Sequence, residues 1–95
     1  MAQVKVVSRE YIDSLLDYLI DAWKGLPQAG RDIDKWDLIE QIDYVEEWTP
    51  KVDLLNRLEG YAADGLLDNQ QKLRLAELRH LVGEYQPILT RLRQS

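Results

Sequence analysis

The chain has 95 residues, with 17 acidic and 12 basic side chains, a formal net charge of −5 and no cysteine. This length suits a single domain with one modest core, and the lack of cysteine excludes disulfides and thiolate chemistry. The negative charge opposes binding to DNA or RNA, whose phosphates require a basic face. With 45% hydrophobic and 31% charged residues, the composition is that of a globular chain.

The sequence predicts neither a secretion signal nor a membrane span. The apolar patch within residues 1–8 is interrupted by Lys5 and is too short for the apolar core of a signal peptide. No stretch approaches the run of about 18 apolar residues that crosses a bilayer. We therefore expect a soluble, cytoplasmic protein.

The first helix is predicted over residues 9–24, with Ser8 as its N-cap. Apolar side chains recur at the spacing of one broad helix face, at Tyr11, Ile12, Leu15, Leu16, Leu19, Ile20 and Trp23. An acidic row occupies the opposite side, at Glu10, Asp13, Asp17 and Asp21. This pattern predicts a helix that packs on two neighbours and turns its acids to solvent.

The second helix is predicted over residues 34–48, after the breakers at Gly25–Pro27 and Gly30, with Asp32 or Asp34 as its cap. Its inward stripe is expected at Trp36, Ile39, Ile42 and Val45, with Leu38 beside it. Tyr44 falls on the far side of the helical wheel, among acidic residues, and is predicted to be exposed.

Two further helices are predicted over residues 50–64 and 69–93. Thr49 can cap the third helix, with Pro50 at its first position. Asp68 and Gln71 have the spacing of a capping box at the start of the fourth. Its apolar stripe keeps phase through Pro87, which predicts a helix kinked near that residue, and a short separate last helix is the alternative.

Four amphipathic helices joined by short connections predict an all-α fold, a four-helix up-and-down bundle formed by residues 1–95 as a single domain. Residues 3–7 alternate in polarity like a strand, but a single strand has no partner in a helical chain. We expect residues 1–7 to form a short extended arm, or to pair across a dimer.

No catalytic signature is found. His80 is the single histidine, without a cysteine or a triad pattern to accompany it, and the glycines form no phosphate-binding loop. We expect a protein that is not an enzyme, with no catalytic residue and no cofactor.

One metal-binding hypothesis has a residue pattern behind it. Glu77 and His80 have the Glu-x-x-His spacing of carboxylate-bridged helical bundles, with Glu84 one turn further on. A second such motif is missing, so only a homodimer can complete this carboxylate/His site. A solvated helix flank is the simpler interpretation, and no metal is expected.

The distribution of acid favours a role in protein interaction. Residues 10–47 hold eleven carboxylates against three bases, whereas residues 51–95 hold six against seven. Every aromatic residue is Trp or Tyr, the types enriched in interfaces. We expect a small module that docks a basic protein partner through an acidic and aromatic face. The candidate partner-binding residues are Asp13, Asp17, Asp21, Tyr44, Glu47 and Trp48.

Three alternatives stay open at this point. Trp48 can instead pack across its own helix joint. Arginines on the last helix, at Arg74, Arg79, Arg91 and Arg93, can neutralise the acidic helices internally or bind a second copy. A purely structural oligomerisation unit, forming a homo-oligomer, is the third alternative.

Overall fold

A computed structural model describes residues 7–94, and within that range all regular structure is helical. In chain order the elements are α1 (Arg9–Lys24), α2 (Leu26–Asp32), the 3-10 turn η1 (Ile33–Lys35), α3 (Leu38–Glu46), α4 (Trp48–Ala63) and α5 (Asn69–Gln94). The all-α prediction is confirmed. Most of the predicted arm, residues 1–6, lies outside the described range, and Val7 packs against the core.

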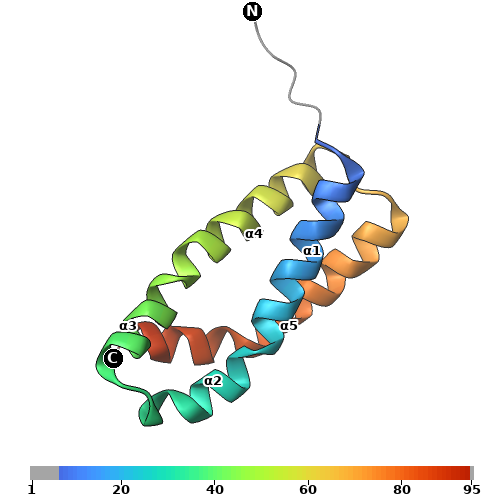
Figure 1. Cartoon of the computed structure of the whole chain (residues 1–95). Coiled ribbons are helices and arrows are strands. Elements are labelled where there is room, and N and C mark those ends of the chain that lie inside the picture. The colour runs from blue at the N-terminus through green and yellow to red at the C-terminus, as the bar shows by residue number, and fades with distance from the viewer. Residues whose placement is uncertain (1–6, 95) are drawn as a thin grey trace, which may run out of the picture.

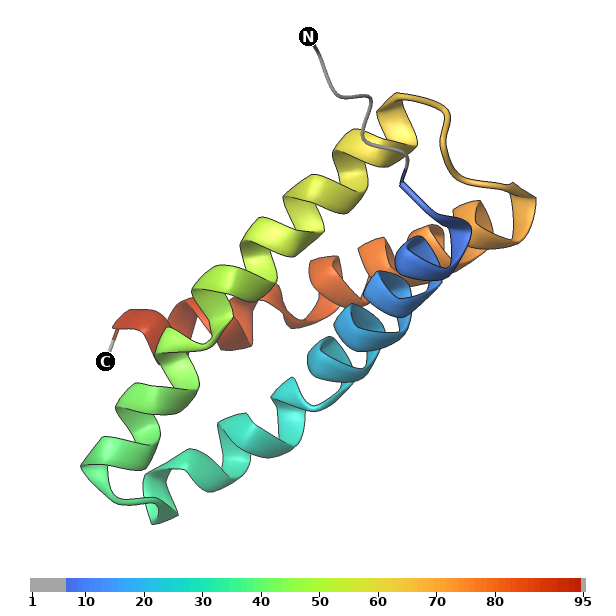
Figure 2. The same cartoon turned by 45° about the horizontal axis from the view of Figure 1, so that its top comes forward.

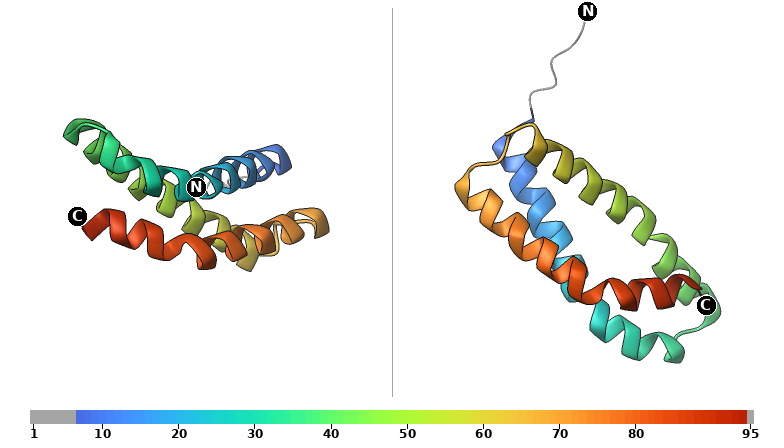
Figure 3. Two further views of the ribbon diagram at one scale, coloured as in Figure 1. Left: turned by 90° about the horizontal axis from the view of Figure 1, so that it is seen from below. Right: turned by 180° about the vertical axis from the view of Figure 1, so that it is seen from behind.

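The five α-helices of residues 7–94 lie in three rods, so the predicted four-helix up-and-down bundle is not confirmed (Figure 1). One rod consists of α1 followed by α2, and a second of α3 followed by α4, returning beside the first. The third rod, α5, packs against and crosses the α1–α2 rod, and its C-terminal end lies between α2 and the α3–α4 rod, as Figures 2 and 3 show.

The segment after α1, where the sequence predicts a break, forms a second helix, α2. Its glycines and its proline occupy positions that a helix tolerates. Gly25 ends α1 and donates its N–H to the carbonyl of Ala22, while Pro27 lies in the first turn of α2, where a missing N–H costs little. Gly30 lies inside α2 at its approach to α5. A Cβ atom there would lie 2.9 Å from Cγ2 of Ile88, so the glycine permits close helix contact.

The predicted helix 34–48 is divided by an extended residue, Trp36. Asp37 then caps α3 by accepting a hydrogen bond of 2.9 Å from the N–H of Glu40, so the predicted caps Asp32 and Asp34 are wrong. At the other end α3 passes directly into α4 through Glu47. Thr49 lies inside α4 and does not cap it.

The core lies between α1, α4 and α5. Fully buried side chains come from all three rods, with the largest at Trp23, Trp48, Ile12, Leu16, Leu19, Leu26, Leu58, Leu75, Leu78 and Leu89. Trp23 and Trp48 meet edge to face, with ring centroids 5.0 Å apart, and each is 1% exposed. This contact joins the α1–α2 rod to the α3–α4 rod.

The predicted inward stripe is wrong at Ile39 and Ile42, whereas its other two members, Trp36 and Val45, are partly buried against the core. Leu38, Ile39 and Ile42 are 69%, 71% and 46% exposed, and α3 contributes no buried residue. Tyr44 is half-buried instead, with its ring centroid 6.3 Å from that of Trp48. The two residues are four apart and Glu47 keeps a helical conformation between them, so they share a face. Burial of Trp48 therefore turns Tyr44 inward and Ile39 outward.

The last helix continues through Pro87, so a separate final helix is excluded. Proline cannot donate a hydrogen bond to the carbonyl of Gly83 and crowds it, and the helix changes direction between its orange and red portions (Figure 3). The predicted capping box is confirmed: the N–H of Gln71 donates to Oδ1 of Asp68 at 2.8 Å. No helix among residues 7–94 is long and apolar enough to cross a bilayer.

The close approach of α2 to α5 predicts opposite effects of one substitution at two helical glycines. In Gly30→Ala the new methyl group collides with Ile88, whereas Gly60 has open space around it. Alanine at Gly60 should stabilise the fold by up to about 1 kcal/mol through helix propensity. Overpacking should leave Gly30→Ala about 1–3 kcal/mol less stable than Gly60→Ala in urea unfolding. Equal stabilisation by both substitutions would contradict the close packing of α2 on α5.

Candidate functional site

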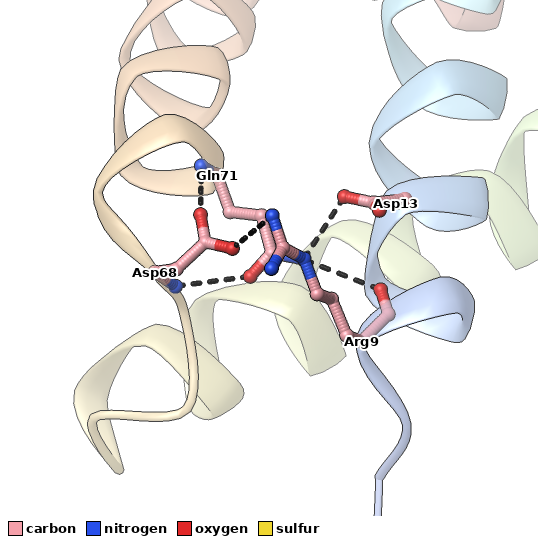
Figure 4. Close-up of polar contacts among 4 residues, drawn as sticks. All are labelled: Arg9, Asp13, Asp68 and Gln71. Carbon is pink, nitrogen blue, oxygen red and sulfur yellow. Dashed lines mark hydrogen bonds and ion pairs between the residues drawn. The ribbon is translucent and has the colours of Figure 1, made fainter.

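The acidic row predicted as a docking surface on α1 is largely engaged by α5. Gln71 is 2% exposed, and its side-chain Nε2 donates to Oδ1 of Asp13 at 2.9 Å and to the carbonyl of Arg9 at 3.2 Å (Figure 4). Arg9 also pairs with Asp68, Nη2 to Oδ2, at 2.9 Å. This network joins the start of α1 to the start of α5, so Asp13 has a structural role.

Asp17 also contacts α5, because Nη2 of Arg74 donates to its Oδ1, but this pair lies at the surface and the Asp17 side chain is 68% exposed. Asp21, one turn further along α1, is exposed. Two of the three α1 carboxylates predicted to meet a partner therefore already contact the C-terminal helix. The Arg74–Asp17 pair agrees with the alternative that arginines of that helix neutralise the acids internally, whereas Asp13 is held by the neutral amide of Gln71.

The other arginines of α5 also contact the rest of the chain. Nε of Arg79 donates to Oε2 of Glu59 at 2.9 Å, which holds the pKa of that carboxyl below its ordinary value. Arg91 donates to the carbonyl of Gly30 at 3.2 Å, and Arg93 to Oγ1 of Thr49 at 3.5 Å. The basic side of α5 thus binds all three rods together.

Trp48 does not belong to any surface, since its ring is buried against Trp23. Tyr44 is half-buried, which corrects the prediction that it is exposed. Burial raises the pKa of its phenol, and Glu47 raises it further. Of the six predicted partner-binding residues, Tyr44 and Glu47 lie together, at a site that the α1 acids do not share.

Tyr44 and Glu47 line a shallow hollow on one flank of α3, here called the acidic pocket. It has a volume of about 240 Å³ and is lined by Trp36, Glu40, Asp43, Tyr44 and Glu47. Its two rings meet edge to face with centroids 5.4 Å apart. Asp37 raises the pKa of nearby Glu40 by charge repulsion, which reflects the density of negative charge. Lys51 partly balances it, with Nζ 3.8 Å from Oε2 of Glu47.

The opposite flank of α3 borders a larger hollow, here called the α3 groove, of about 530 Å³. Its lining comes from α2, η1, α3 and the end of α5, at Gly30, Ile33, Asp34, Leu38, Gln41, Ile42, Val45, Glu46, Arg91 and Leu92. Sequence reasoning missed this groove because it assigned Leu38 and Ile42 to the core. The four-residue spacing of Tyr44 and Trp48 is the signal that could have reversed that assignment.

The hypothetical metal ligands of α5 do not converge within one chain. Glu77 faces Lys24, with Oε1 3.7 Å from Nζ, and Nε2 of His80 lies 3.4 Å from Oε2 of Glu84. In the part of the chain that the structure describes, no three His, Asp or Glu side chains are grouped to hold a metal ion. The homodimeric form of this hypothesis stays a prediction.

Comparison with known proteins adds no assignment. A scan against models of protein families, a search of curated proteins and a search of solved structures each find no match. The two flanks of α3 therefore form the candidate site.

The hydrogen bonds from Gln71 to α1 predict a large loss of stability when an apolar side chain of similar size replaces this glutamine. In Gln71→Leu, the carbonyl of Arg9 and the carboxylate of Asp13 lose a buried donor, which should cost about 1–3 kcal/mol in the free energy of unfolding. Gln70→Leu, one residue away and exposed, should change it by about 0.5 kcal/mol or less. Urea unfolding of the two variants measures the difference, and equal stability would show that the network contributes nothing.

Proposed function

We propose that this protein is a small helical interaction module that docks a basic segment of a partner protein at the acidic pocket of α3. The observation that carries the proposal is the composition of that pocket, in which two aromatic rings are accompanied by three carboxylates. Aromatic faces attract ammonium and guanidinium groups, and carboxylates add charge-assisted hydrogen bonds. An arginine or lysine side chain matches both features.

The wider charge around the pocket supports the same assignment. Residues 32–47 contain seven carboxylates and one base, Lys35. Such a field speeds the approach of a basic partner and disfavours an acidic one. Among residues 7–94 no acidic cluster converges on a metal site, so the spread of charge favours an extended cation such as guanidinium.

The proposal retains part of the surface expected from sequence and moves its centre. Tyr44 and Glu47 belong to it, Trp48 supports it from within the core, and the α1 acids Asp13 and Asp17 drop out because α5 engages them. A cytoplasmic location and a capacity to form homo-oligomers stay predictions from sequence.

Charge reversal at two exposed aspartates tests the proposal. The probe is a peptide of alternating arginine and glycine, and the reference is a citrulline–glycine peptide of similar shape without charge. Asp43→Lys should weaken binding of the arginine peptide about three- to tenfold, because a carboxylate of the pocket is replaced by a like charge. Asp21→Lys, the same charge change on α1, should have little effect. NMR titration measures both affinities and identifies the residues affected.

Two outcomes would contradict this proposal. Equal weakening by Asp43→Lys and Asp21→Lys would show that the peptide responds only to net charge. Equal binding of the citrulline peptide would show that no cation is recognised. Trp36→Leu gives a further check, because loss of the ring should reduce affinity about two- to fivefold.

A further inference from the structure

The outward side of α3 exposes apolar side chains where a solvated helix would carry polar ones. Leu38 and Ile39 are more than two-thirds exposed, and Ile42 is nearly half exposed. Leu38 and Ile42 are one turn apart and both border the α3 groove. A contiguous exposed apolar patch of this kind is typical of an interaction surface.

The α3 groove, beside these exposed side chains, is bordered by α3 on one side and by α2, η1 and the end of α5 on the other. Ile33 and Leu92 are 7% and 4% exposed and form its apolar base, while Leu38 and Ile42 stand at its mouth. Arg91 borders it from α5 and is bound to the carbonyl of Gly30. The groove is therefore apolar in its depth and supported by α2, α3 and α5.

Charge at the edge of the groove indicates what covers it. Asp34 and Glu46 line the groove, and Asp43 and Glu47 lie on the other flank of the same helix. We propose that the α3 groove binds an amphipathic helix of a partner protein, with its apolar side in the groove and basic side chains toward these acids. This inference builds on the proposed function and assigns the partner's basic segment to the flank of such a helix.

A second copy of this chain fits the groove less well. A two-fold symmetric contact through the groove would place two copies of its acidic edge, formed by Asp34 and Glu46, in one interface. Like charges at such a contact oppose association. The exposed apolar residue Leu73 lies on α5 and does not line the groove.

The test uses a model peptide of leucine and lysine in which all leucines fall on one helical face. A second peptide has the same composition in strict alternation, so that it has no apolar helical face. NMR titration of the full chain should show shifts at Leu38, Ile42 and Arg91 with the first peptide, and binding of the second should be at least about tenfold weaker.

Serine substitutions separate apolar contact from charge, because they leave the net charge unchanged. Ile42→Ser or Leu38→Ser should weaken binding of the first peptide about tenfold. Leu73→Ser removes a similarly exposed apolar side chain outside the groove and should leave affinity unchanged. All three side chains are outside the buried core, and circular dichroism checks that each variant stays folded.

Three outcomes would overturn the inference. One is equal affinity of Ile42→Ser and Leu73→Ser, and another is a set of shifts centred on Leu73. The third is self-association in sedimentation that Ile42→Ser abolishes, which would assign the groove to a second copy. If Ile42→Ser has no effect while Asp43→Lys still weakens the arginine peptide, the groove inference fails and the acidic pocket stands. The reverse result would reject the pocket and retain the groove.

Discussion

The packing of Trp48 against Trp23 decides which side of α3 faces outward. The two buried rings meet edge to face and fasten the start of α4 to the end of α1. Since the chain stays helical through Glu47, the direction of Trp48 also sets the direction of Tyr44, one turn earlier. Ile39 and Ile42 are then left on the outer side. This orientation places Tyr44 in the acidic pocket and Ile42 beside the α3 groove.

Arginines on α5 decide where negative charge stays available. Arg74 engages Asp17 on α1 and Arg79 engages Glu59 on α4, while buried Gln71 engages Asp13. None of these contacts reaches residues 32–47, a segment that includes α3 and holds seven carboxylates. Acidic residues of α1 therefore contribute to assembly of the three rods, whereas those of α3 stay exposed, as the proposed docking of a basic partner requires.

Local patterns predicted much of this fold correctly. The bounds of α1 match, and Asp68 with Gln71 starts α5 as the capping-box spacing indicates. Errors arose where a tertiary contact overrode a local signal. In the sequence Gly30 predicts a helix break, but in the structure it lies inside α2 and permits the close approach of α5. The apolar periodicity of α3 predicts that Ile39 and Ile42 face the core, but burial of the large Trp48 ring turns a different side of the helix inward.

The contrast between local sequence signals and tertiary contacts also applies to the candidate site. Tyr44 and Glu47 could be selected from sequence, because aromatic and acidic residues are visible there. Their partners in the pocket, Trp36 and Glu40, depend on a chain reversal at Asp37 that periodicity does not reveal. The engagement of Asp13 by Gln71 joins residues 58 positions apart, so no local pattern contains it.

The orientation of α3 can be measured directly by paramagnetic broadening of methyl NMR signals with an inert gadolinium chelate in solution. We expect strong broadening for the methyl groups of Ile39 and Ile42, and protection for those of Ile12 and Ile20 in the core. Protection of Ile39 and Ile42 would show that α3 turns its apolar side inward, and would contradict the account of both flanks.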